Sequence, residues 1–269
     1  MMDVIQVADL RKSYGKTEVL CGISFQVRRG EIFGILGTNG AGKTTTLECM
    51  EGFRKYDGGR IQLKGSVGIQ LQSASLPGCM KPLEAVELFA RWKRTKPDGE
   101  LIEGLGIREF SKKKYAELST GQKRRLHLVL ALTGNPDILF LDEPAAGLDV
   151  KGRLALHERI RRLNRRGATI VLASHDMAEV EELCGRIAIL NSGRIAFLGT
   201  AEELADRVDS RFVIRIRTEQ GERTYRAAHI GEDLLRILES LKREKVEVLD
   251  VSVSRGTLEQ HFMDLAKGA

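Results

Sequence analysis

The order of apolar and polar positions predicts an alternation of short strands and longer helices. Apolar and polar residues alternate over 23–27, and after a charged turn the run 32–36 is continuously apolar. A continuous apolar run between turn residues is typical of a strand that is buried on both faces. The glycine-rich segment 37–42 follows, and residues 43–51 are predicted to form a helix. The chain therefore opens with strand, turn, strand, loop and helix.

The same pattern continues through the middle of the chain. Apolar residues recur at helical spacing from Pro82 to about Lys93, and a polar stretch with several lysines continues to Glu117. Further along, helices are predicted over 122–133 and 150–166, strands over 138–141 and 169–173, and a hairpin over 187–198. Strands that alternate with helices indicate an α/β layer.

A second, smaller pattern begins after about residue 209. It comprises a strand around 212–216, an amphipathic helix over 232–245, a β-rich stretch over 246–253 and a helix from Thr257. We therefore expect a first domain over 1–209, with a helical subdomain at about 82–125, and a C-terminal accessory domain over 210–269. The accessory domain carries no ligand motif.

Composition excludes several classes of protein. The 269 residues are 42% hydrophobic and 30% charged, which excludes a disordered, collagenous or low-complexity chain. With 43 Lys and Arg against 37 Asp and Glu, the net charge of +6 permits an acidic partner without requiring one. The longest apolar runs fall far short of the roughly 20 residues that cross a bilayer, and no secretory signal is apparent. Four scattered cysteines argue against a zinc site or a disulfide framework.

The glycine-rich segment carries the clearest chemical signal. It reads Gly37-Thr38-Asn39-Gly40-Ala41-Gly42-Lys43-Thr44 and matches the phosphate-binding pattern GxxxxGK[ST] in full. Glycines let successive backbone N–H groups converge on phosphate oxygens, and the helix N-terminus adds its partial positive charge. We expect Lys43 to contact the β- and γ-phosphates, Thr44 to coordinate Mg²⁺ and Thr45 to contact the nucleotide. The alternative, a glycine loop used only as a turn, is disfavoured by its position between a buried strand and a helix.

Two acidic residues end the strand predicted over 138–141. We expect Asp142 to be the second protein group for Mg²⁺, and Glu143 to orient or deprotonate the water that attacks the γ-phosphate. Taken alone, an Asp-Glu pair at a strand end is more often a helix cap or a solvated turn. The phosphate loop upstream favours the catalytic interpretation.

A segment between the phosphate loop and Asp142 reads Leu118-Ser119-Thr120-Gly121-Gln122, and we call it the signature segment. With it, residues 3–208 resemble the ATP-binding subunits of ABC transporters, and Tyr14, Gln72, Asp149 and His175 follow in the family's order. The resemblance implies an α/β fold of the P-loop NTPase class. In that fold a RecA-like α/β core carries an antiparallel β subdomain and a helical subdomain, and here a small C-terminal α/β appendage follows.

The resemblance also implies a role for each position. Tyr14 stacks on adenine, His175 holds the γ-phosphate and the attacking water, and Gln72, with Gln70 as the alternative, senses Mg²⁺ and that water. Asp149 supports the site across a dimer interface. Ser119 and Gly121 offer a hydroxyl and a backbone N–H to the γ-phosphate of a nucleotide held by a second copy, and Thr120 and Gln122 are expected among the nucleotide-binding residues of the same segment.

The implied assembly is a head-to-tail dimer of two copies with ATP and Mg²⁺ between them. ATP joins the copies, and hydrolysis removes the γ-phosphate that both contact. The expected catalytic residues are all present, so an active ATPase is predicted instead of an inactive regulatory subunit. They are Lys43, Gln72, Glu143 and His175.

Other features resemble the ABC-2 type, which includes daunorubicin and multidrug exporters. Thr120 stands where the commonest family signature has glycine, a variation associated with one exporter branch, and about 60 residues follow the first domain. In that type an integral-membrane permease is a separate protein, so the resemblance implies a peripheral subunit at the cytoplasmic face of the cell membrane. The helical region over 82–117 would dock the permease near Gln72. The alternatives are the motor of an importer and a non-transport ABC ATPase.

Three further stretches are interpreted from their length or charge. The 29 residues from Lys43 to Gln72 are fewer than the family suggests, so the β arm beside the nucleotide is expected to be trimmed. The arginines between Arg153 and Arg166, and the run Glu179, Glu181 and Glu182, are interpreted as solvated helix faces. No nucleic acid partner is expected, because the basic helix has no interleaved aromatic residues to stack on bases.

Overall fold

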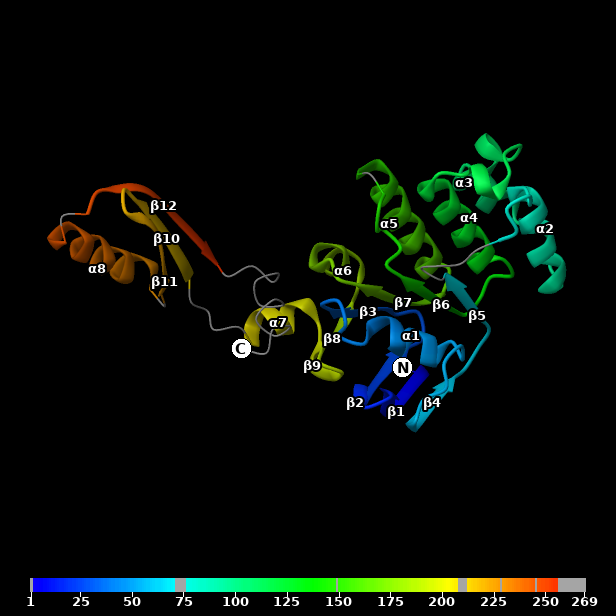
Figure 1. Cartoon of the computed structure of the whole chain (residues 1–269), viewed down its shortest axis with the longest axis horizontal. Coiled ribbons are helices and arrows are strands. Elements are labelled where there is room, and N and C mark those ends of the chain that lie inside the picture. The colour runs from blue at the N-terminus through cyan, green and yellow to red at the C-terminus, as the bar shows by residue number, and fades with distance from the viewer. Residues whose placement is uncertain are drawn as a thin grey trace. The chain divides into compact units, whose positions relative to one another are not determined.

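Three sheets and the helices packed on them make up the described part of the chain (Figure 1). The computed structural model describes residues 2–70, 76–148, 150–207, 212–227, 229–244 and 246–255. The chain divides into two units, Met1–Gly199 and Thr200–Ala269. The domain boundary expected at 209 and the helix expected from Thr257 lie outside the described residues.

An antiparallel sheet is formed by the N-terminal strands. These are β1 (Asp3–Tyr14), β2 (Thr17–Arg28) and β4 (Gly58–Leu63), with β1 in the middle. Ile23, Phe25 and Val27 of β2 are buried while Ser24 and Gln26 are not, because side chains alternate across a strand. The alternation in the sequence therefore marks the face of β2 that joins the core.

A mixed sheet forms the centre of the first unit. Its strands are β3 (Ile32–Gly37), β5 (Val67–Gln70), β6 (Ile138–Asp142), β7 (Thr169–Ser174), β8 (Arg186–Asn191) and β9 (Arg194–Gly199). They lie in the order β5-β6-β7-β3-β8-β9, and neighbours are parallel except in the β8–β9 hairpin. Every residue of β3, β6 and β7 is buried, as the continuous apolar runs predict. The carboxyl ends of these three strands meet at one edge of the sheet.

Helices cover both faces of β3. On one face, α1 (Lys43–Met50) shares a core with Phe33, Ile35 and the antiparallel sheet. On the other face, Gly34 lies so close to α6 (Met177–Leu183) that an added Cβ would be 2.6 Å from Val180 Cγ1. α5 (Val150–Arg165) packs beside α6.

The predicted helical region contains several short helices. They are α2 (Pro82–Trp92), α3 (Gly99–Gly104), the 3₁₀ helices η1 (Ile107–Phe110) and η2 (Tyr115–Glu117), and α4 (Thr120–Leu132). α4 packs against both β5 and α2, which joins this region to the central sheet. Within the described ranges, no helix is long and apolar enough to span a bilayer.

The second unit has its own small core. A sheet in the order β11-β10-β12 is formed by β10 (Phe212–Thr218), β11 (Gly221–Ala227) and β12 (Val248–Arg255). The amphipathic helix α8 (Ile230–Arg243) contributes Leu241 to a cluster with Ile214 and Ile216 of β10. A short helix, α7 (Ala201–Arg207), precedes them in the chain. The architecture of both units confirms the predicted α/β fold class.

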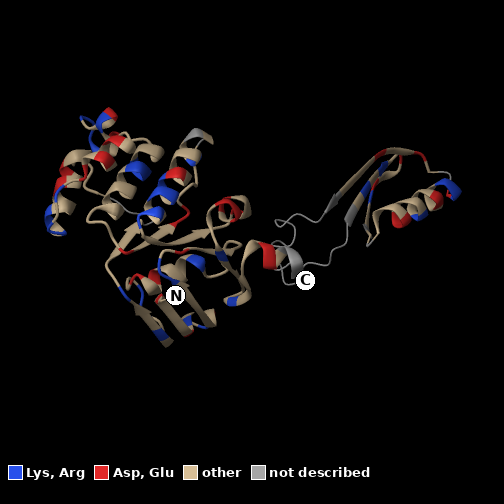
Figure 2. Ribbon diagram, turned by 180° about the vertical axis from the view of Figure 1, so that it is seen from behind, with Lys and Arg blue, Asp and Glu red and all other residues tan. Residues whose placement is uncertain are grey.

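Two predicted solvated faces are partly wrong. Glu179 of α6 is only 3% exposed and Arg159 of α5 only 9% exposed, and His157 of α5 is likewise buried. The reason is tertiary packing. His157 and Glu179 face each other where α5 packs on α6, and Arg159 lies against Gly104 of α3, where an added Cβ would be 3.1 Å from its Nη1. Elsewhere, Lys, Arg, Asp and Glu are intermixed along the helices of both units (Figure 2).

Candidate functional site

The phosphate loop connects β3 to α1 and has a backbone that only glycine adopts readily. Gly42, immediately before α1, has a φ of 105°, and a Cβ at this position would lie 2.8 Å from Leu20 Cδ2. At Gly37 an added Cβ would lie 2.8 Å from both Ala41 Cβ and the Leu190 carbonyl oxygen. These two glycines therefore let the loop fold closely against β2 and β8.

The N-terminus of α1 is suited to bind an anion. No side chain caps it within the described residues, so the first N–H groups of the helix remain available together with the positive end of the helix dipole. Asn39, Gly40 and Thr44 are exposed, whereas Ala41 is buried and Thr38 and Thr45 are half-buried. The loop thus combines a solvent-facing rim with a rigid base.

The side chain of Lys43 folds back onto the phosphate loop. Its ammonium donates to the Gly37 carbonyl at 2.8 Å and to the Thr38 carbonyl at 3.3 Å, and the residue is 7% exposed. Burial lowers the pKa of Lys43, while the nearby charges of Glu143 and Asp142 raise it. A phosphate would replace neutral carbonyls with an anionic partner, which favours the charged ammonium.

Asp142 and Thr44 form the group expected for Mg²⁺. Thr44 Oγ1 donates to Asp142 Oδ2 at 3.0 Å, which joins the start of α1 to the end of β6. Asp142 Oδ1 is buried without a hydrogen-bond partner, and burial raises the pKa of this carboxyl. An unpartnered carboxylate oxygen next to a hydroxyl fits the all-oxygen donor set that Mg²⁺ prefers.

Glu143 lies between Lys43 and His175. One carboxylate oxygen accepts a hydrogen bond from His175 Nδ1 at 2.7 Å, and the other is 3.8 Å from Lys43 Nζ. The residue has a φ of 49°, a left-handed conformation that side chains other than glycine adopt at a cost, and such strain is concentrated at functional sites. The structure therefore brings together three of the four residues predicted to be catalytic.

Tyr14 lies at the end of β1 with 42% of its surface exposed. Lys12 Nζ is 5.5 Å and Arg54 Cζ 5.2 Å from the centre of its ring. The exposed ring can stack on a base, and the two cations add positive charge where a nucleotide would bring phosphates.

The signature segment lies at the start of α4, away from the phosphate loop. Ser119 caps the helix by accepting from the Gln122 N–H at 3.3 Å, and the Gln122 side chain accepts from the Ser119 N–H at 3.1 Å. Ser119 and Thr120 are exposed, and Gly121 is half-buried. Ser119, Gly121 and Gln122 line a cavity of about 650 Å³ with residues of the loop after Glu143.

Two predicted site residues, Gln72 and Asp149, lie outside the described residues. Gln70, the alternative to Gln72, ends β5 and is buried, with its Oε1 unpartnered in the same cavity.

Sequence reasoning missed two features. Arg124 of α4 lines this cavity with a buried, unpartnered Nη1 and is attracted by Glu143. Glu179 is buried behind His175, and the signal that was available is the spacing of the apolar residues Met177, Val180 and Leu183, which turns that side of α6 toward the core.

Comparison with known proteins agrees with this geometry. Residues 20–146 match the family model described as ABC transporter. The linearmycin resistance ATP-binding protein LnrL of Bacillus subtilis (strain 168) is 33% identical over 231 residues, covering 79% of this chain and 74% of that protein. The daunorubicin resistance ATP-binding protein DrrA3 of Streptomyces coeruleorubidus is 31% identical over 303 residues, covering 97% of this chain and 95% of that protein.

The similarity extends to an importer and to a solved fold. The sn-glycerol-3-phosphate import ATP-binding protein UgpC 1 of Rhizobium johnstonii is 31% identical over 271 residues, covering 93% of this chain and 70% of that protein. The solved structure of an ATP-binding subunit of an ABC transporter has a TM-score of 0.70 and 26% identity, covering 76% of this chain and 92% of that chain. The chain belongs to the ABC transporter family as an ATP-binding subunit, and it is an ATPase that matches the ABC-2 export type.

Proposed function

We propose that this chain is the motor of an ABC exporter, which hydrolyses ATP with Mg²⁺ and drives a separate integral-membrane permease at the cytoplasmic face of the cell membrane. The observation that carries the proposal is the junction of Lys43, Glu143 and His175 at the carboxyl ends of buried parallel strands. Such a junction suits transfer of a γ-phosphoryl group to water.

The chemistry assigns a separate task to each residue. Lys43 and the N–H groups at the start of α1 hold the β- and γ-phosphates. Glu143 takes a proton from the attacking water as its oxygen bonds to the γ-phosphorus, and the bond from that phosphorus to the bridging oxygen breaks to give ADP and phosphate. His175, which is hydrogen-bonded to Glu143, holds the water and the γ-phosphate in position for the reaction. Thr44 and Asp142 would hold Mg²⁺, which would supply positive charge to the phosphates.

Each copy contributes to two sites of a head-to-tail dimer. Ser119 and Gly121 bind the γ-phosphate held by the other copy, and Gln72 and Asp149 complete the water-sensing and interface contacts. The exposure of Ser119 and Thr120 supports this role, because a group that must reach another copy has to lie at the surface. Loss of the γ-phosphate then weakens the dimer and allows the motor to reset.

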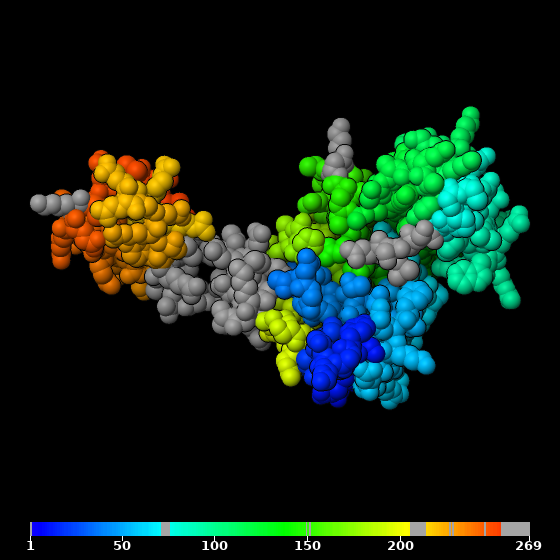
Figure 3. All heavy atoms as spheres, viewed as in Figure 1, coloured from blue at the N-terminus to red at the C-terminus, as the bar shows by residue number. Residues whose placement is uncertain are grey.

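The permease docks on an apolar surface that α2 forms together with Phe53, which follows α1. Trp92 is 75% and Leu88 52% exposed on α2, and Phe53 is 61% exposed. Trp92, Phe53 and Phe89 line an apolar cavity of about 300 Å³ together with Leu76, which lies next to the stretch that contains Gln72. In the space-filling view, α2 (cyan) adjoins the light-blue surface that precedes it in the chain (Figure 3). An amphipathic cytoplasmic helix of the permease fits such a surface.

The direction of transport is inferred from the relatives that cover almost the whole chain. The daunorubicin resistance protein covers 97% of this chain and is matched over 95% of its own length, whereas the importer subunit covers 93% of this chain but is matched over only 70% of its own length. Export is therefore the proposal, and import is the alternative that the experiment below distinguishes.

The test is to trap the motor on its partner. The Glu143→Gln variant binds ATP but hydrolyses it slowly, so it is expected to remain dimeric on the permease in native membranes, from which it is isolated and its partners are identified. The matched control, Glu143→Gln combined with Lys43→Ala, cannot hold ATP and should release the dimer. Recovery of a multi-span protein without a substrate-binding protein supports export.

Other outcomes would contradict parts of the proposal. Recovery with a substrate-binding protein would indicate an importer. Recovery with ribosomes or DNA and without a membrane protein would indicate a non-transport ABC ATPase.

A further inference from the structure

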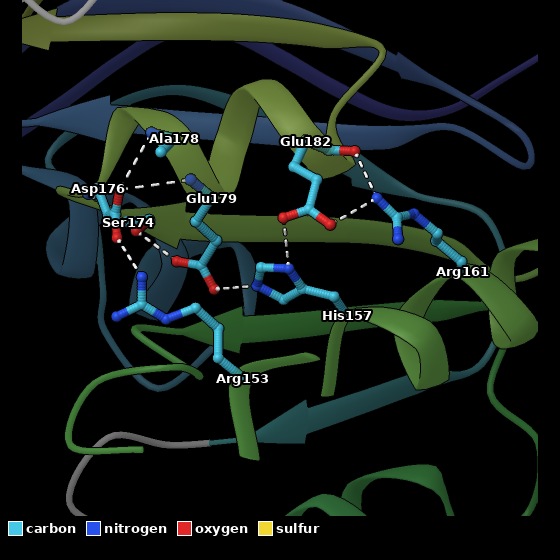
Figure 4. Close-up of polar contacts among 8 residues, drawn as sticks. All are labelled: Arg153, His157, Arg161, Ser174, Asp176, Ala178, Glu179 and Glu182. Atoms are coloured by element: carbon cyan, nitrogen blue, oxygen red, sulfur yellow. Dashed lines mark hydrogen bonds and ion pairs between the residues drawn. The ribbon is translucent and has the colours of Figure 1, made fainter. Parts of the chain in front are cut away.

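A polar cluster with a buried centre includes the residues on both sides of His175 and has no part in the chemistry described above. It joins the end of β7 to α5 and α6 (Figure 4). Its members are Arg153, His157, Arg161, Ser174, Asp176, Glu179 and Glu182. Ser174 is fully buried, and Glu179 and His157 are 3% and 1% exposed. His175 itself is exposed, so the cluster borders the site from the inside of the protein.

Hydrogen bonds of the cluster fix the backbone on both sides of His175. The Ser174 hydroxyl donates to Glu179 Oε2 at 2.7 Å and accepts from the Asp176 N–H at 3.1 Å. Because its proton is committed to Glu179, the hydroxyl keeps a lone pair directed at Asp176. Asp176 in turn caps α6 by accepting from the Ala178 N–H at 3.0 Å. His175 is therefore the central residue of a short closed turn.

On its other side Glu179 faces α5. Its second oxygen, Oε1, is 3.6 Å from His157 Nε2, and His157 Nδ1 is 2.9 Å from Glu182 Oε2. Arg161 bonds Glu182 at 2.8 Å, which closes the chain of contacts at the surface. In Figure 4 the carboxylate of Glu179 points between Ser174 and His157.

We propose that Glu179 is a positioning residue for hydrolysis: by orienting the Ser174 hydroxyl it holds the turn that aims His175 at Glu143 and the γ-phosphate. This inference rests on the role given to His175 in the proposed function. Glu179 bonds the Ser174 hydroxyl and not His175, so it acts on His175 through the 174–176 backbone.

The cost of burying Glu179 supports a role beyond packing. A carboxylate removed from water is unfavourable, and burial raises the pKa of Glu179 against the opposing effects of Ser174 and His157. An apolar residue of similar size would pack at this position with equal or greater stability. The polar side chain is instead bonded to the residue that precedes His175, where an apolar side chain would leave the Ser174 hydroxyl free to rotate.

The experiment compares variants of the purified full chain by steady-state hydrolysis of ATP. Ser174→Ala and Glu179→Ala are expected to lower kcat about tenfold, with the KM for ATP changed less than about twofold, because a misdirected catalytic group slows the reaction without removing binding contacts. Glu179→Gln keeps an acceptor oxygen for Ser174 and is expected to retain most of the wild-type kcat. Glu182→Gln is the matched control, since Glu182 contacts His157 but not Ser174.

The same substitutions in a second genetic background distinguish a positioning role of Glu179 from an effect on the stability of the protein. In a His175→Ala chain, Ser174→Ala should cause no further loss of kcat, because the group that it positions is gone. An equal loss in both backgrounds, or no loss in the wild-type background, would overturn the inference, and so would a kcat that follows the melting temperature across the variants. If Glu179→Ala does not fold, Ser174→Ala and Glu179→Gln still decide the question. A fully active His175→Ala protein would refute the proposed role of His175 itself, and the inference with it.

Discussion

The starts of α1 and α4 are both expected to bind phosphate, yet they are built differently. α1 follows a buried strand through Gly42, has no side-chain cap and has a buried lysine in its first turn. α4 follows a 3₁₀ turn and is capped by the exposed Ser119, which exchanges a reciprocal pair of hydrogen bonds with Gln122. One helix start leaves its N–H groups available, while the other satisfies them with its own side chains.

This difference indicates which half of the ATP site a single copy can supply. The phosphate loop is fixed by the core before nucleotide arrives, so a single chain can bind ATP. The Ser119 hydroxyl accepts from the Gln122 N–H and keeps its own proton, which in the proposed function it donates to a phosphate oxygen that only a second copy presents. The cap occupies the Gln122 N–H, so the start of α4 offers other anions fewer free backbone donors than the start of α1 does.

The largest expected effect concerns Lys43. Lys43→Ala should weaken ATP binding to the isolated chain by about 100-fold or more, because it removes a charge-assisted contact to the β- and γ-phosphates. Titration with a fluorescent ATP analogue measures the change. Lys113→Ala, which removes an exposed lysine, is the matched control and should leave the affinity unchanged. Equal affinities for all three proteins would mean that α1 is not the binding half.

Ser119→Asp separates the cap from the phosphate contact. Aspartate caps helices as well as serine does, so the melting temperature should stay within about 2 °C, and ATP binding to one copy should persist. Turnover should fall about 100-fold, because a carboxylate repels the γ-phosphate of the other copy. Light scattering with ATP on the Glu143→Gln background then reports whether the dimer forms. A dimer of normal stability would remove Ser119 from the interface.

Gly42→Ala tests the rigidity of the first helix start. The left-handed backbone and the contact with Leu20 should cost about 2 kcal/mol of unfolding free energy. Gly99→Ala, where a Cβ meets no atom within 4 Å, is the matched control, with an expected change below about 0.5 kcal/mol. Urea denaturation measures both, and similar values for the two variants would show that the loop tolerates a side chain.

The smallest effect lies at the other end of α1. Burial and the charges of Asp142 and Glu48 raise the pKa of Glu51 from 4.5 to about 8, and a carboxylate at a helix C-terminus is itself unfavourable. Folded protein therefore holds more protons than unfolded protein between these values, so stability from this group is full below pH 4.5 and is lost as the pH rises through 8.

Glu51→Gln removes this dependence. Without nucleotide, the stability of the variant relative to wild type should increase by about 1 kcal/mol between pH 5 and pH 8.5. Urea titrations of both proteins at the two pH values measure the difference. Parallel stability curves would show that Glu51 does not carry a raised pKa.

Much of the fold follows from local pattern, because burial on both faces leaves a continuous apolar run. The run 32–36 became β3 (Ile32–Gly37), and the helix predicted over 43–51 became α1 (Lys43–Met50). The burial of Glu179 was missed, although the spacing of Met177, Val180 and Leu183 turns that side of α6 toward the core. Its contact with His157 could not be predicted from a local pattern, because His157 lies on another helix.

The candidate site likewise contains some contacts that the sequence motifs predict and others that depend on tertiary packing. The contact between Thr44 and Asp142 could be expected, because both residues belong to a motif whose chemistry requires them together. The left-handed backbone of Glu143 and the cations around Tyr14 follow from tertiary packing, which a linear pattern does not record.

The position of β3 in the sheet also affects how the chain is made. β3 is flanked by β7 and β8, and Phe33 pairs with Val171 and Arg186, so both of its neighbours are synthesised more than 130 residues later. At about 5–20 residues per second, the ribosome leaves this strand without its sheet partners for roughly 7–30 seconds. We expect a chaperone to bind a nascent chain that exposes an unpaired apolar strand for so long. The phosphate loop of the nascent chain reaches its final structure only after β7 and β8 have paired with β3.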